Sequence, residues 1–136
     1  MFQSAAEEVT YRISPPVDNT ELNALFAAAW QNHAPRDFRP VLRRSLIYVC
    51  ACMGDTLVGF VNVAWDGGIH AFLLDTTVHP AHGRRGIGRR LVALAAAEAQ
   101  ARGMEWLHVD YEPHLEPFYR ACGFGPTAAG LIHLRL

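Results

Sequence analysis

The sequence lacks the features that mark secreted, metal-binding or membrane-spanning proteins. Its three cysteines, Cys50, Cys52 and Cys122, have no Cys-x-x-Cys spacing, which fits neither a disulfide framework nor a zinc site. Seven histidines include no His-x-x-x-His motif, so we expect no metal. No apolar run reaches the roughly 20 residues of a membrane span, and the N-terminus does not read as a signal peptide. These absences predict a cytoplasmic protein with no membrane contact.

Charge is also scarce. Twelve basic and 13 acidic residues give a net charge of −1, and 51% of the residues are hydrophobic. This balance favours neither disorder nor binding to nucleic acid. A chain of 136 residues has the size of one domain with one hydrophobic core. We therefore expect a single domain over residues 1–136.

Hydrophobic periodicity and turn residues predict the order of strands and helices. Glycine-containing turns at residues 54–55 and 66–68 indicate an antiparallel meander of three strands. The strand after the long third helix must cross over the sheet, so it lies parallel to the last meander strand. The result is an α/β (α+β) chain with a mixed, mostly antiparallel sheet. We expect strands at residues 9–13, 46–53, 56–65, 69–78, 104–111 and 131–136, and helices from about 18 to 32, 38 to 44, 87 to 102 and 114 to 122.

Residues 78–91 place closely spaced glycines and arginines between a strand end and a helix start. A helix N-terminus carries free N–H groups and the positive end of the helix dipole, which makes it a site for phosphate. Glycines let an anion approach the backbone, and arginines at positions 84, 85, 89 and 90 add charge. A dinucleotide fingerprint needs a third glycine where Leu91 stands, and a P-loop needs Gly-Lys-Ser/Thr. The loop therefore predicts a pyrophosphate site of another kind.

Two motifs carry a more specific resemblance. Val78-x-Pro80 followed by Arg85-Gly86-x-Gly88 resembles the coenzyme A loop of the GNAT (GCN5-related N-acetyltransferase) superfamily. Residues 118–124, Phe-Tyr-x-x-Cys-Gly-Phe, resemble the C-terminal signature of the same family. The resemblance implies the GNAT fold, a twisted sheet flanked by helices on both faces, and acetyl-CoA as cofactor. The residues that it implies for the cofactor are Thr77, Val78, Gly83, Arg84, Arg85, Gly86, Ile87, Gly88, Arg89 and Tyr119.

The resemblance also implies a reaction, in which an acceptor amine attacks the thioester directly. The main-chain N–H of Val78 would face the thioester oxygen, and Tyr119 would protonate the leaving thiolate. An alkylamine is protonated at neutral pH, so a base must accept its proton. We predict Asp75 in this role, because it is a carboxylate on an otherwise apolar strand; Glu112 and His114 are secondary candidates. Glu112 also occupies the place of an asparagine that often contacts the pantetheine arm in the family.

The first helix, the loop after it and the hairpin should form the acceptor pocket. This brings Trp30, His33, Phe38 and Trp65 into consideration, since aromatic side chains favour flat or cationic partners. A small amine, an antibiotic, a peptide N-terminus and a protein lysine all stay open as acceptors. A homodimer is possible through the final strand.

Two other functions stay open. A GNAT-folded module could bind acyl-CoA as a sensor without turnover, although Tyr119 and Asp75 favour an enzyme. A nucleotide-binding regulatory domain would instead be stabilised by ATP or NAD and not by acetyl-CoA.

Overall fold

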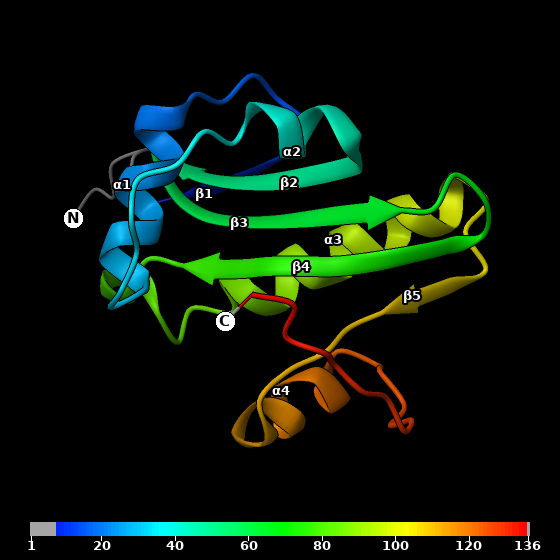
Figure 1. Ribbon diagram of the computed structural model, residues 1–136. Coiled ribbons are helices and arrows are strands. Elements are labelled where there is room, and N and C mark those ends of the chain that lie inside the picture. Colours follow the sequence, from blue (N-terminus) through cyan, green and yellow to red (C-terminus); the bar gives the residue numbers. More distant parts are fainter. Residues whose placement is uncertain (1–7, 136) are drawn as a thin grey trace.

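The computed structural model describes residues 8–135, which form one five-stranded sheet with helices on both faces (Figure 1). The strands lie in chain order, with the fifth parallel to the fourth and all other neighbours antiparallel. This confirms the predicted mixed, mostly antiparallel sheet. The elements are β1 Val9–Ile13, α1 Asn19–Ala29, α2 Arg39–Arg44, β2 Ser45–Met53, β3 Thr56–Trp65, β4 His70–Val78, α3 Ile87–Ala101, β5 Trp106–His108 and α4 Glu116–Ala121, with 3-10 turns η2 Pro80–His82 and η3 Pro113–Leu115.

Helix α1 starts at a capping box and packs on one face of the sheet. The Asp18 carboxylate accepts a hydrogen bond from the Glu21 N–H at 2.8 Å, and the Glu21 side chain accepts one from the Asp18 N–H at 3.3 Å. The helix buries Leu22, Leu25 and Phe26 against Cys50, Leu57 and Phe60 of the sheet. It ends at Ala29, earlier than the predicted residue 32, because Trp30 has an extended backbone.

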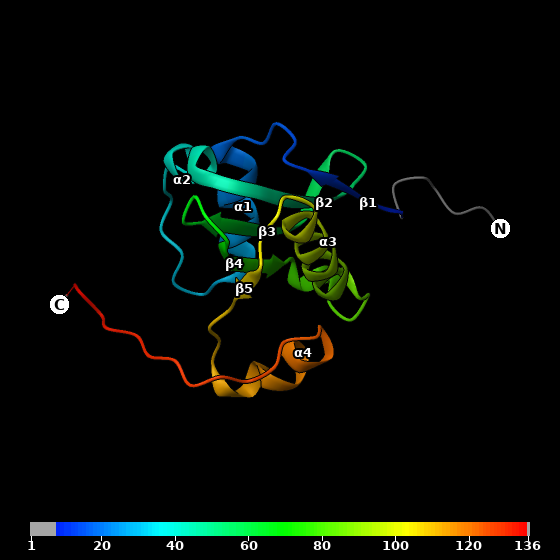
Figure 2. The same ribbon diagram turned by 90° about the vertical axis from the view of Figure 1, so that its right-hand side faces the viewer.

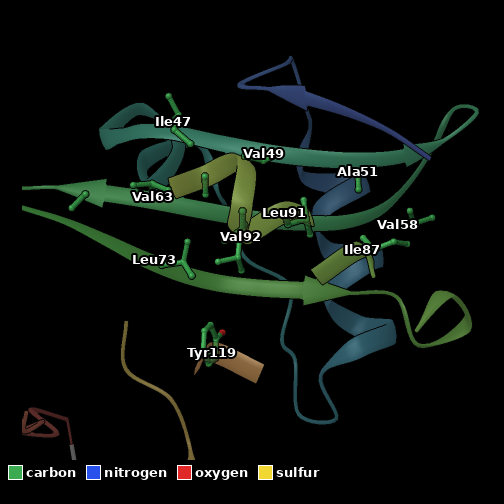
Figure 3. Close-up of a cluster of buried hydrophobic side chains, with 13 residues drawn as sticks. Ile47, Val49, Ala51, Val58, Val63, Leu73, Ile87, Leu91, Val92 and Tyr119 are labelled. Carbon is green, nitrogen blue, oxygen red and sulfur yellow. The ribbon is translucent and has the colours of Figure 1, made fainter. Parts of the chain in front are cut away.

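Helix α3 covers the opposite face of the sheet (Figure 2). Its buried residues Ile87, Leu91 and Val92 meet alternate side chains of β2 and β3, such as Val49 and Val63 (Figure 3). Each such fully buried side chain stabilises the fold by roughly 1.5–3 kcal/mol. Because α1 covers one face of the sheet and α3 the other, the middle strands are apolar on both sides.

Three predicted elements near the C-terminus differ from the structure. Strand β5 pairs with β4 over only three residues, so the predicted strand at 104–111 is too long. The predicted helix at 114–122 is divided into η3 and α4. Residues 131–135 form no strand, and the last residue of that prediction, Leu136, lies outside the described residues. An alternating pattern needs a neighbouring strand to become one, and no other part of the described chain pairs with residues 131–135.

None of the helices in residues 8–135 combines the length and the apolar character that crossing a membrane requires.

Candidate active site

A β-bulge in β4 shapes the site. Phe60 of β3 faces Thr77, but Asn62 faces Leu74, so β4 contains one residue more than β3 over this interval. Asp75 lies in the bulge with φ +58°, a left-handed conformation that Asp tolerates better than most residues. Past Phe72, β4 has no pairing with β5. The outer edge of β4 is therefore open from the bulge to its end, where the two strands diverge (Figure 1).

The N–H of Val78 points into this open edge. The N–H of the next residue, His79, donates to the Val58 carbonyl at 2.8 Å, and Gly59 faces Val78. This pattern defines a non-hydrogen-bonded antiparallel pair, in which both residues direct their own N–H groups away from each other's strand. The Val78 N–H consequently points away from β3, where it is available to a ligand.

A short chain of hydrogen bonds ties the end of α1 to the bulge. The Trp30 indole N–H donates to Thr77 Oγ1 at 3.1 Å, and the Thr77 hydroxyl donates to the Asp75 carbonyl at 2.8 Å. Thr77 is only 3% exposed. Its hydroxyl group is thus engaged in hydrogen bonds within the protein, and the cofactor contact that the resemblance implies for Thr77 stays a prediction.

A cavity of about 520 Å³ opens beside the bulge, between β4 and the loop after α1. His33 is held in its wall, because one of its ring nitrogens lies 2.8 Å from the Asn23 side-chain oxygen. Burial raises the pKa of the Asp75 carboxyl, and the neighbouring Arg36 partly offsets this. The cavity thus combines aromatic walls with one carboxylate of raised pKa. Its lining residues are Phe26, Trp30, Gln31, Asn32, His33, Ala34, Arg36 and Asp75.

The glycine- and arginine-containing loop leads into α3 at the same end of the sheet (Figure 1). Gly86 precedes the helix with φ +75°, and its carbonyl accepts the first helical hydrogen bond, from Arg90 at 3.0 Å. The first-turn N–H groups of Ile87, Gly88 and Arg89 therefore have no partner within the helix. These donors beside exposed arginines fit a pyrophosphate.

The three loop glycines have different roles. A Cβ on Gly86 would meet no atom within 4 Å, so its positive φ explains the glycine there. A Cβ on Gly88 would lie 3.3 Å from the Phe118 ring, so Gly88 lets α4 pack against the start of α3. The Gly83 N–H donates to the Pro80 carbonyl at 3.4 Å and closes η2. Gly86 thus sets the left-handed turn that starts α3, and Gly88 supplies one of the free first-turn N–H groups.

Tyr119 of α4 lies below β4 (Figure 3). Its ring stacks on Tyr111 at 4.9 Å and meets Phe118 and Phe124 edge-on. The residue is 7% exposed. Its ring is thus fixed in position, and only a small part of it can meet a ligand.

Two predicted site residues, Trp65 and Glu112, are not part of the cavity wall. Trp65 faces Ala71 near the far hairpin, seven strand positions from Val78, which corresponds to roughly 20 Å. Glu112 has a 79% exposed side chain and pairs with His114 at 3.5 Å. The wall of the cavity also contains Arg36, which no motif in the sequence indicated. In the sequence Arg36 lies two residues before Phe38, and in the structure its guanidinium lies over the Phe38 ring at 4.5 Å.

No three histidine, cysteine, aspartate or glutamate side chains within residues 8–135 come together as a metal site.

Comparison with known proteins agrees with this geometry. The Acetyltransferase (GNAT) family matches residues 16–124. A GNAT family acetyltransferase from Streptococcus pneumoniae TIGR4 has the same fold, with TM-score 0.80, 24% identity and coverage of 94% of this chain and 98% of that chain. The aminoglycoside N-acetyltransferase AAC(6')-Iy, solved with CoA, has TM-score 0.72 and 17% identity over 94% of this chain and 95% of its own.

An uncharacterized ycf52-like N-acetyltransferase of Prochlorococcus marinus is 26% identical over an alignment of 113 residues, which covers 79% of this chain. The chain spans 63% of the length of that relative. Since the family match covers most of its length, the chain belongs to the GNAT acetyltransferase family, as its two motifs predicted.

Proposed function

We propose that the protein is an acetyl-CoA-dependent N-acyltransferase that moves an acetyl group to a primary amine by direct attack. The observation that carries this proposal is the bulge in β4. It leaves the Val78 N–H free at an open strand edge, and it places Asp75 in the wall of a cavity at the same end of the sheet.

The donors at the start of α3 fit the pyrophosphate of coenzyme A. The N–H groups of Ile87, Gly88 and Arg89 would hold it, with Arg84 and Arg85 adding positive charge. Acetyl-CoA would supply the acetyl group as a thioester. That a structural neighbour, AAC(6')-Iy, was solved with CoA supports this choice of cofactor.

Three groups of this chain would act on the reacting atoms. The Val78 N–H would donate to the acyl oxygen, where negative charge develops; losing such a donor typically costs roughly 10²–10³-fold in rate. Asp75 would take the proton of the amine in the cavity. The Tyr119 hydroxyl would hold the proton that the leaving sulfur needs.

Release of free thiol from acetyl-CoA, measured across a panel of primary amines, tests the proposal. The chain contains no lysine, so acetyl-lysine found by mass spectrometry must come from an added acceptor. Amine-dependent thiol release supports the enzyme. Binding of CoA without acylation of any amine would leave the alternative of a silent acyl-CoA sensor, which the burial of Tyr119 favours.

We also propose that residues 1–136 act as one domain in the cytoplasm. All three cysteines are free thiols in the structure, which is the usual state in a reducing compartment.

A further inference from the structure

Arg36 and Asp75 lie next to each other in the wall of the cavity without closing into a hydrogen-bonded pair. Their nearest atoms, Arg36 Nη2 and Asp75 Oδ2, are 3.6 Å apart, and both side chains are partly exposed. Within residues 8–135 neither charged group makes a hydrogen bond. The neighbouring ion pair between Arg39 and Asp37 is different, because the Arg39 guanidinium donates two hydrogen bonds of 2.9 Å to the Asp37 carboxylate. The Arg36–Asp75 contact is therefore loose and easily separated.

The position of Arg36 is nevertheless fixed by its surroundings. The Asn23 side chain bonds both backbone groups of Arg36, donating to its carbonyl at 2.9 Å and accepting from its N–H at 3.0 Å. The guanidinium lies over the Phe38 ring at 4.5 Å and near the Phe26 ring at 5.8 Å. The guanidinium N–H groups make no hydrogen bond within the described residues, so they remain available to a ligand. A guanidinium binds a carboxylate with two parallel hydrogen bonds.

We propose that Arg36 is a specificity residue that binds a carboxylate carried by the acceptor close to its amine, while Asp75 receives the amine. The acceptor would then be an amino acid or a similar zwitterion. This inference rests on the proposed function. A zwitterion that lies against both side chains can hydrogen-bond to Arg36 with its carboxylate and to Asp75 with its amine. Its apolar side chain can pack on the half-exposed Trp30.

The test compares L-leucine with L-leucinamide, which has the same shape but no carboxylate. Wild type should acetylate leucine with the higher kcat/KM. Arg36→Gln should raise the KM for leucine roughly 10- to 100-fold with little change in kcat, as expected for the loss of hydrogen bonds between charged groups. Its kinetics with leucinamide should hardly change. Arg36→Lys should keep part of the preference, and the matched control Arg39→Gln should behave as wild type.

Thermal melting and CoA affinity must first show that each variant is folded. Equal loss of leucine and leucinamide activity in Arg36→Gln, or a wild type that does not prefer leucine, overturns the inference. Calorimetry of leucine binding in the presence of CoA tests the Arg36 site independently of the proposed enzymatic function. If no amine is acetylated but Arg36→Gln alone weakens leucine binding, the Arg36 site stands and the enzyme does not. If wild type binds leucine no better than leucinamide, the Arg36 site is wrong.

Discussion

Asp75 combines a left-handed backbone with a half-buried carboxylate. Because burial raises its pKa above the ordinary value, the fold favours the protonated form. The stability that Asp75 contributes is then fully present below the unfolded pKa of about 3.9, and it is lost as the pH rises through the folded value. At neutral pH the ionised Asp75 side chain therefore lowers the stability of the fold.

Replacing Asp75 with Asn should separate these two effects. Asn tolerates the same backbone conformation, so Asp75→Asn should fold. We expect turnover to fall roughly 10²–10⁴-fold through loss of the base. At pH 7 the variant should melt at a higher temperature than wild type, and the difference should narrow as the pH falls toward about 4. Thiol-release kinetics and thermal melts at several pH values measure both effects; unchanged turnover would remove Asp75 from the mechanism.

Tyr119→Phe removes one hydroxyl and keeps the aromatic cluster. We expect turnover to fall much more than cofactor affinity, because the ring contacts with Tyr111, Phe118 and Phe124 stay. Steady-state kinetics and CoA titration measure the two quantities. Full activity in this variant would assign Tyr119 to packing alone.

At the scale of elements, the N-terminus of α3 is the expected anion site. Gly86→Asp places a negative charge at this end, and Gly86→Ala is the matched control, since both have the same unfavourable φ. We expect CoA affinity to be at least about tenfold weaker in Gly86→Asp than in Gly86→Ala, from the loss of favourable charge interactions. Calorimetry gives the two dissociation constants. Equal constants would contradict the assignment of the loop.

The hydrogen bond from the Trp30 indole N–H to Thr77 Oγ1 connects the end of α1 to β4, and its contribution to stability can be measured. Trp30→Phe keeps an aromatic ring but leaves Thr77 Oγ1 without the indole donor. The free energy of unfolding should fall by about 0.5–1.5 kcal/mol in urea denaturation. Trp65→Phe, at the distant hairpin, should change it less. A similar loss in both variants would mean that the hydrogen bond to Thr77 has no special role.

Elements with a local signal were predicted well from the sequence. The three meander strands and α3 need only periodicity and turn residues, and their bounds agree with prediction to within about one residue, the usual uncertainty of assignment. The short β5 and the missing strand at 131–135 depend on which neighbour pairs with them. Such pairing is a property of the whole sheet, so the local pattern could not reveal it.

The sequence could predict only part of the candidate site, because local patterns do not show which distant residues meet. Val78 and the loop at Gly86 follow from contiguous motifs, and Asp75 from its contrast with apolar neighbours. Arg36 meets Asp75 across 39 positions of sequence, and the left-handed φ of Asp75 leaves no mark in the residue pattern. Both features come from tertiary packing.

At the scale of the whole molecule, the C-terminal segment is the most exposed apolar part of the described chain. Leu131, Ile132 and Leu134 are 81%, 84% and 88% exposed, and the segment extends away from the sheet (Figure 2). Apolar surface of this kind favours association, and β5 is an open edge.

We expect wild type to form a dimer through residues 131–135. Leu131→Asp with Leu134→Asp should shift it to a monomer in analytical ultracentrifugation, because charges oppose burial of this segment. Ile69→Asp, an exposed apolar position on the hairpin, is the control and should stay dimeric. A monomeric wild type would contradict the expectation.

The open edge of β4 also makes the Val78 amide a natural reporter of occupancy. A backbone N–H in the interior of a sheet normally exchanges with solvent slowly, but this one has no strand to protect it. Its hydrogen should exchange quickly in the free protein and slowly once an acyl group accepts its hydrogen bond. A single amide resonance would then follow the filling of the site without any assay of turnover.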